Sequence, residues 1–238
     1  KAEAEKGEAE KGAEGKPESM ETEVDEEAAF STEQSEAPSG MTFQVGLRLG
    51  YGLPGGEAHE GSDLGNTYAG HIPLWVDLGL KVIPNVVVGF YAQYGIAMMA
   101  GDLCPDDGCG GSINRIGIQG HYEVSPGEFL NPWFGLGIGY EWANAWGDVQ
   151  YSPGDVRDTD VTLRGFEYVN LQGGVLFRVM PELGVGPYLS LSAGQYTDVS
   201  SEVEGQQPDW ELGGWLGDSA LHQWMSFGVR GAYEVWPF

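Results

Sequence analysis

WFGLGIGYEW, residues 133–142, alternates between large apolar residues and small or charged ones. Successive side chains of a β-strand point to opposite faces of the sheet. The apolar side chains from Phe134 to Tyr140 therefore share one face, and the three glycines and Glu141 share the other. These glycines lie within the alternating run and no helix follows, so they do not form a nucleotide-binding loop. The stretch predicts a β-strand with one apolar face and one small or polar face.

The same period of two recurs from Met41 to the end of the chain. The eight predicted strands cover residues 41–52, 71–83, 86–98, 113–124, 133–142, 166–179, 185–196 and 223–236. Three of the connections are short, and the other four span roughly 53–70, 99–112, 143–165 and 197–222. Alternation of short turns with long loops is typical of bacterial outer-membrane barrels, whose short turns are periplasmic. An even number of strands then places both chain termini in the periplasm.

Charged residues in these strands fall on the polar face, and the apolar face carries essentially none. The nine charged residues predicted to face inward are Arg48, Asp77, Lys81, Arg115, Glu123, Glu141, Arg178, Arg230 and Glu234. Burying them in the core of a soluble barrel would be very costly. In a narrow transmembrane barrel they can pair across a lumen. Five positive and four negative groups nearly neutralise each other, which favours a structural network that plugs the lumen over an ion-selective pore.

The fold class predicted is therefore all-β: an eight-stranded antiparallel up-and-down transmembrane β-barrel with a disordered N-terminal extension. Strands of about ten residues match the tilted span of a bilayer. In this architecture and in its terminal Phe238, region 41–238 resembles the small outer-membrane β-barrel superfamily of the OmpA transmembrane, OmpX and OmpW kind. The resemblance implies the outer membrane of a Gram-negative bacterium, contact with outer-membrane lipid, and Phe238 as the signal that the outer-membrane assembly machinery recognises. No subfamily motif carries over a specific activity.

Residues 1–40 have a different composition, with four lysines, thirteen acidic residues and few large apolar side chains. Such a segment cannot bury enough surface to offset its ordering entropy. We interpret it as an acidic low-complexity periplasmic tail, either a spacer or an electrostatic tether for a basic envelope partner. The chain begins at Lys1 without a signal sequence, and we interpret it as the mature form of an exported protein.

The formal net charge of −25 excludes nucleic acid as a partner, because phosphate binding requires a clustered basic face. The long loops are strongly acidic, with one aspartate cluster in 102–107 and another in 155–160. Divalent cations can bridge such carboxylates, but no twelve-residue calcium-binding loop is present. Acidic surfaces are usually only solvated, so no metal site and no cofactor are assigned.

Cys104 and Cys109, the two cysteines of the chain, enclose a short turn-like segment. In an oxidising compartment they are expected to form a disulfide bond. The alternatives are a reduced pair or metal ligands, although two cysteines without nearby histidines are too few for a zinc site.

Three histidines are candidates for catalysis. His222 and Ser226 share the inward face of one predicted strand, but four strand residues separate them by about 13 Å, too far for a histidine to activate a serine. His59 lies beside Ser62 and Asp63 without a recognisable signature. His121 lies two residues from Glu123 in the predicted lumen, where a structural role is the simpler interpretation. We therefore expect no enzymatic activity.

Three functions remain as hypotheses. The first is a structural or interaction anchor without an open pore, which presents acidic loops outside the cell and a charged tail to an envelope protein partner. The second is a barrel of the OmpW kind that transports small solutes. The third is an outer-membrane lipid-modifying enzyme, for which the sequence offers the least support.

Overall fold

The computed structural model describes residues 41–59, 61–100, 109–152, 155–203 and 220–235. The predicted tail of residues 1–40, Cys104 and Phe238 lie outside these described residues. The interpretations that concern them therefore stay predictions.

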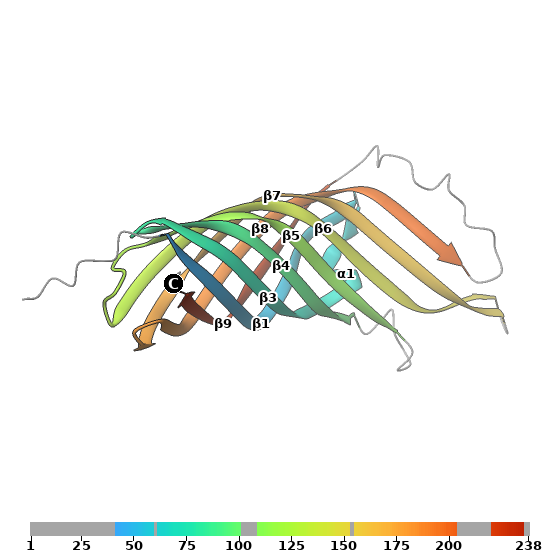
Figure 1. Ribbon diagram of the computed structural model, residues 1–238. Helices are drawn as coiled ribbons and strands as arrows, with labels where there is room; N and C mark the ends of the chain where they lie inside the picture. Colours follow the sequence, from blue (N-terminus) through green and yellow to red (C-terminus); the bar gives the residue numbers. More distant parts are fainter. Residues whose placement is uncertain (1–40, 60, 101–108, 153–154, 204–219, 236–238) are drawn as a thin grey trace, which may run out of the picture. The chain divides into compact units, whose positions relative to one another are not determined.

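Within the described residues, eight long antiparallel strands form a closed barrel (Figure 1). The strands are β1 (Thr42–His59), β3 (Tyr68–Ile83), β4 (Val86–Met99), β5 (Gly110–Glu123), β6 (Leu130–Ser152), β7 (Asp155–Met180), β8 (Leu183–Val203) and β9 (Leu221–Val235). Each strand pairs with the next along the chain, and pairing of β1 with β9 closes the barrel. This is the up-and-down topology that the sequence predicts, and the predicted all-β, eight-stranded antiparallel barrel is confirmed.

The two ends of the barrel differ in their connections. At the turn end, β3 joins β4 through Pro84 and Asn85, β5 joins β6 through residues 124–129, and β7 joins β8 through Pro181 and Glu182. The other connections lie at the opposite end, called here the loop end. The three predicted short turns are therefore present, all at one end of the barrel.

The third long connection is mostly strand, contrary to expectation. Residues 143–165 were expected to form a loop, but β6 and β7 stay paired up to Ser152 and Asp155. As Figure 1 shows, β6, β7 and β8 extend further than the other strands at the end where α1 lies. A strand that meets water on both faces needs no apolar alternation, so a search for alternation does not find it.

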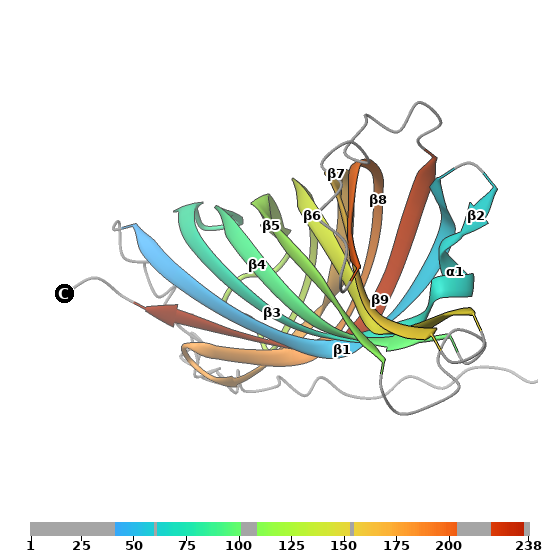
Figure 2. The same cartoon turned by 90° about the vertical axis from the view of Figure 1, so that its right-hand side faces the viewer.

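The first long connection folds back on the barrel. It contains the two-residue strand β2 (Ser62–Asp63), which pairs with β1, and the short helix α1 (Leu64–Thr67) (Figure 2). Asp63 caps α1 by accepting a hydrogen bond from the Gly65 backbone N–H at 2.9 Å. Within the described residues, no helix is both long enough and apolar enough to cross a membrane.

The polarity of the barrel wall is reversed relative to a water-soluble protein. Outward side chains such as Leu47, Phe90 and Leu136 are more than half exposed, whereas the charged side chains of Arg48, Glu141 and the other inward charges in the middle of the barrel are almost completely buried. Exposed apolar patches of this extent are unfavourable in water. The wall therefore has the polarity required of a barrel that faces lipid.

Candidate functional site

The interior of the barrel is the candidate site, since inward side chains from all eight strands meet there. Four layers follow one another from the turn end to the loop end. We call them the turn-end tier, the middle tier, the loop-side tier and the apolar plug, and define each below by its residues.

The turn-end tier joins four strands through charges. Lys81 Nζ lies 2.9 Å from Glu123 Oε2 and 2.6 Å from Glu234 Oε1. Arg178 Nη2 lies 3.8 Å from Glu234 Oε1, and the Gln44 side-chain amide donates to Glu123 Oε1 at 2.8 Å. A small pocket opens beside these groups. Lys81 and Arg178 keep partial exposure, so this tier forms the mouth of the interior at the turn end.

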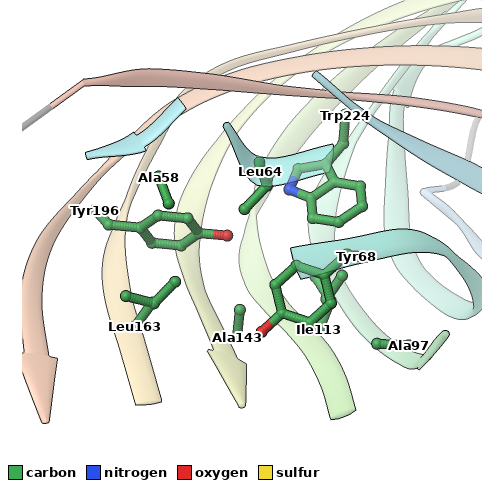
Figure 3. Packing of buried hydrophobic residues seen from close by; sticks show 9 residues of the cluster. All are labelled: Ala58, Leu64, Tyr68, Ala97, Ile113, Ala143, Leu163, Tyr196 and Trp224. Atoms are coloured by element: carbon green, nitrogen blue, oxygen red, sulfur yellow. The ribbon is translucent and has the colours of Figure 1, made fainter. Parts of the chain in front are cut away.

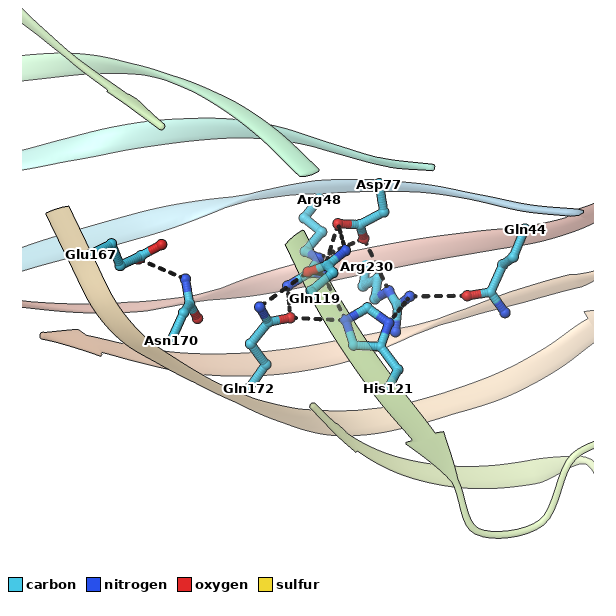
Figure 4. A network of polar contacts seen from close by, with 9 residues as sticks. All are labelled: Gln44, Arg48, Asp77, Gln119, His121, Glu167, Asn170, Gln172 and Arg230. Atoms are coloured by element: carbon cyan, nitrogen blue, oxygen red, sulfur yellow. Dashed lines mark hydrogen bonds and ion pairs between the residues drawn. The ribbon is translucent and has the colours of Figure 1, made fainter. Parts of the chain in front are cut away.

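Two arginines and one aspartate form the ionic part of the middle tier (Figure 4). Arg48 binds Asp77 in a bidentate manner, with Nε and Nη2 at 2.9 and 2.8 Å from the two carboxylate oxygens. Arg230 Nε lies 3.5 Å from Asp77 Oδ2. The His121 ring lies between the guanidinium groups, 3.4 Å from Arg48 Nη2 and 3.2 Å from Arg230 Nη2, and Gln172 Oε1 accepts from Arg48 Nη1 at 2.7 Å. Bidentate geometry makes this the strongest type of ion pair.

Aromatic rings enclose the two guanidinium groups of the middle tier. The Arg48 guanidinium carbon lies 4.5 Å from the Trp75 ring centre and 5.7 Å from that of Tyr188. The Arg230 guanidinium carbon lies 4.1 Å from the Trp133 ring centre. Aromatic faces stabilise cations, more strongly where water is excluded. The rings thus help to hold two positive groups close to a single carboxylate.

The loop-side tier has the opposite charge excess. Arg115 Nε donates to Glu141 Oε2, and Arg115 Nη1 lies 3.7 Å from Glu167 Oε1. Glu167 also accepts a hydrogen bond from the Tyr91 hydroxyl and one from the Asn170 amide at 2.8 Å. One buried guanidinium therefore serves two buried carboxylates.

Among the described carboxylates of the interior, Glu141 has the most side-chain partners. Besides Arg115, its carboxylate accepts hydrogen bonds from the Tyr196 hydroxyl and, at 3.2 Å, from the Trp224 indole. His222 Nε2 lies 3.1 Å from Glu141 Oε1, and the His222 ring stacks on Tyr196 with a centroid distance of 3.9 Å. Donors from β5, β8 and β9 thus converge on a carboxylate of β6.

All nine charged residues that the sequence predicts to face inward lie in these three tiers. The sequence interpretation omitted a tenth residue, Glu167, which is buried. Pairing with β8 shifts between Glu167 and Val169, as expected of a β-bulge. Phe166 and Tyr168 point outward on one side of the shift, but Asn170 points inward beyond it. The break in period concealed Glu167, and no other pattern in the sequence points to it.

An apolar plug lies in the interior toward the loop end. It consists of Ala58, Leu64, Tyr68, Ala97, Ile113, Ala143, Leu163, Tyr196 and Trp224, whose side chains gather inside the barrel (Figure 3). Helix α1 supplies Leu64, and Tyr68 follows the helix directly. Both side chains are almost completely buried. The first long connection therefore folds into the barrel rather than away from it.

The outer wall becomes polar at the level of the plug. Asn144 lies between Ser112 and Thr162 in the strand register. Its amide donates to Ser112 Oγ at 3.0 Å, and Thr162 Oγ1 donates to Asn144 Oδ1 at 2.9 Å. Polar groups outside and apolar groups inside are the arrangement of a water-soluble protein. The outward side chains are thus apolar in the middle of the barrel and polar at the level of the plug. This change indicates where an apolar environment around the wall would end.

Leu64→Ala is expected to destabilise the plug by about 2–5 kcal/mol, because it removes a fully buried side chain and leaves a cavity. Hydrogen exchange of the amides in 62–71 measures the effect as faster exchange. Asn66→Ala, at an exposed position of the same helix, is the control and should exchange like the wild type. Equal exchange in both variants would contradict a packing role for Leu64.

The candidate catalytic pairs do not form catalytic geometry. His222 is engaged with Glu141, and Ser226 Oγ has no hydrogen-bond partner within the described residues. His121 contacts the middle tier, whereas Glu123 bonds to the turn-end tier. Both pairs therefore take part in packing and charge compensation.

The remaining candidates lie outside the interior tiers or outside the described side chains. Asp63 caps α1, and His59 ends β1. No group of three or more His, Cys, Asp or Glu residues is placed to hold a metal ion in the part of the chain that the structure describes. Cys109 directly precedes β5, and within the described residues it is not a free cysteine. Because Cys104 is not described, its pairing with Cys109 stays a prediction.

No family model matches the sequence, and no curated protein gives a significant match. Solved structures resemble the chain at low identity. Neisserial surface protein A has 15% identity and a TM-score of 0.40, covering 81% of this chain and 96% of its own. A major outer membrane protein from Thermus thermophilus has 13% identity and a TM-score of 0.45, covering 82% and 99%. The outer membrane protease OmpT from Escherichia coli has 8% identity and a TM-score of 0.35, covering 84% and 98%.

These similarities concern the fold alone. The barrel is assigned from its own strand pairing, which closes between β1 and β9. The chain folds as a closed eight-stranded up-and-down antiparallel β-barrel.

Proposed function

We propose that this protein is an integral outer-membrane β-barrel that acts as a closed anchor. It presents acidic loops outside the cell and its acidic tail, with both chain termini, in the periplasm. The observation that carries the proposal is the barrel interior, where paired charges from different strands and an apolar plug occupy successive layers. A barrel filled in this way serves to hold its loops and tail at the membrane rather than to conduct.

The order of charges in the interior supports a barrier to ions of both signs. The middle tier has two guanidinium groups for one carboxylate, and the loop-side tier has one guanidinium for two carboxylates. A permeating cation is repelled by the first excess and an anion by the second, and these forces are strong in a low-dielectric interior. With Glu167 included, the interior charges are five positive and five negative, so the interior of the barrel is neutral overall.

The outer surface supports the proposed location. Its apolar side chains provide a face for lipid, and its aromatic pairs include Tyr122 with Phe134 toward the turn end and Tyr140 with Phe166 toward the loop end. Outer-membrane lipid is therefore the first partner that we propose. The assembly machinery, through Phe238, and an envelope protein, through the tail or loops, are the others.

Single-channel recording in a planar bilayer tests the closed state. The wild-type protein is expected to show no stable, large conductance in concentrated KCl with either polarity, because both charge excesses and the plug lie in the path. A gel shift between unheated and boiled samples verifies folding of the same preparation. A stable, large conductance from folded protein would contradict the anchor and favour transport of small solutes.

A further inference from the structure

His121 is a buried histidine that lies between the two arginines of the middle tier (Figure 4). Its Nδ1 lies 3.2 Å from Arg230 Nη2. Its Nε2 lies 3.1 Å from Gln172 Oε1 and 3.4 Å from Arg48 Nη2. Both ring nitrogens therefore face polar groups from other strands, and the chemistry of those groups determines which nitrogen carries a proton.

These contacts fit the neutral imidazole with its proton on Nε2. A guanidinium group donates hydrogen bonds but cannot accept them, so Arg230 requires Nδ1 to be an acceptor. Arg48 Nη1 donates to Gln172 Oε1, which identifies that atom as the carbonyl oxygen, and His121 Nε2 therefore donates to it. Arg48 Nη2 directs its own N–H groups to other acceptors of the interior. A second proton on the ring would place an N–H group against an N–H group of Arg230.

A charged ring at this position would also have no carboxylate of its own among the described residues. Asp77 already pairs with both Arg48 and Arg230. The next carboxylate along the same strand, Glu123, pairs with Lys81. The contacts of the ring on β6 and β7 are neutral aromatic and amide side chains. An imidazolium would thus be a third positive charge beside one carboxylate, where water does not screen the repulsion.

His222, a second buried histidine, has the opposite surroundings. Its Nε2 lies 3.1 Å from Glu141 Oε1, and its Nδ1 has no hydrogen-bond partner within the described residues. A charged ring there would form an ion pair with the carboxylate. The barrel therefore contains a matched control, a buried histidine whose protonation the contacts favour rather than oppose.

We propose that His121 is an acid-sensitive switch built into the barrel interior. Uptake of a proton by its ring replaces the hydrogen bond to Arg230 with two opposed donors and adds a positive charge beside Arg48, so the middle tier loosens. The apolar plug takes no part, and the switch requires no open pore. The proposal rests on contacts inside the barrel and is independent of the role as an anchor.

Nitrogen-15 NMR of the histidine side chains tests the neutral form in the full-length protein folded in detergent micelles. Ring nitrogens with and without a proton have distinct chemical shifts, and the signals that disappear in His121→Gln belong to His121. At pH 7 we expect a protonated Nε2 and an unprotonated Nδ1. The other tautomer, or a doubly protonated ring at this pH, would overturn the proposal.

Urea unfolding in lipid vesicles at pH 7 and pH 5 measures the switch. An unfolded chain protonates its histidines near pH 6.5, so below about this value the unfolded state binds the extra proton and stability falls as the pH falls. Between the two pH values, the unfolding equilibrium constant of the wild type should rise about tenfold more than that of His121→Gln, whose amide forms hydrogen bonds but does not titrate. His121→Asn, a second neutral variant, should behave in the same way.

His222→Gln is the control, and its response to acid should be at least as large as that of the wild type. A gel shift between unheated and boiled samples verifies folding of each protein at both pH values. The same acid response in the wild type and in a folded neutral variant of His121 would contradict the switch. Channel recording at neutral pH tests the closed anchor separately, so the two proposals can fail independently.

Discussion

Arg115→Met is expected to lower the free energy of unfolding by about 3–5 kcal/mol, because the loss of one partner leaves buried charge uncompensated. Arg115 is almost completely buried and is the cation of both Glu141 and Glu167. Without it, two carboxylates of the loop-side tier face each other in a site closed by the plug. Methionine approximates the apolar part of the arginine side chain, so the loss reports charge rather than volume.

Urea titration of the folded barrel in lipid vesicles, followed by tryptophan fluorescence, measures this change. Arg164→Met is the matched control, because Arg164 lies on the exposed face of β7 and should shift stability by less than about 0.5 kcal/mol. Adding Glu141→Gln and Glu167→Gln to Arg115→Met should recover a large part of the loss, because both uncompensated charges are then gone. Equal stability of the Arg115 and Arg164 variants would mean that the loop-side tier is solvated.

The sequence predicts the barrel well because lipid imposes a strict rule on the wall. Along 133–142, every second side chain must be apolar where the wall faces lipid, and Glu141 must then point inward. The same rule predicts that the other eight charged residues of the strands point into the interior. The pairs that those charges form depend on the stagger between strands, which a one-dimensional pattern does not contain. Arg48 and Asp77, for example, belong to neighbouring strands, whereas Lys81 and Glu123 do not.

The rule fails where a β-bulge shifts the strand period or where the medium around the wall changes. At Glu167 a bulge shifts the period, so the inward position cannot be read by counting. Beyond the lipid the wall meets water, and the strands of 143–165 lose the alternation that would identify them. The apolar plug was missed for a related reason. Leu64 lies in a connection outside any alternating run, and only the folding of α1 against the interior makes it a core residue.

The reversal of polarity along the wall leads to a second large effect, on the outward face of β9. Val229→Arg is expected to destabilise the membrane-embedded barrel by about 2–4 kcal/mol, because a charge on the lipid face near the middle of the bilayer loses its hydration. Val229 is exposed on the outer wall, next to Leu49 and Pro187 in the register. Gln223→Arg, on the same face of the same strand but at the level where the wall turns polar, is expected to cost less than about 1 kcal/mol.

The two variants introduce the same side chain into one strand, so the difference between them isolates depth in the membrane. Their unfolding free energies in lipid vesicles should differ by at least about 1 kcal/mol, with Val229→Arg the less stable. In detergent micelles, which adapt to the protein, the difference should become smaller. Arg164, which is exposed on the outer wall beside Trp142 and Asp198 in the register, shows that a charge is accommodated at that level. Equal stability of the two variants in vesicles would mean that lipid does not cover the middle of the wall, and the exposed leucines, valines and phenylalanines would then need another apolar partner.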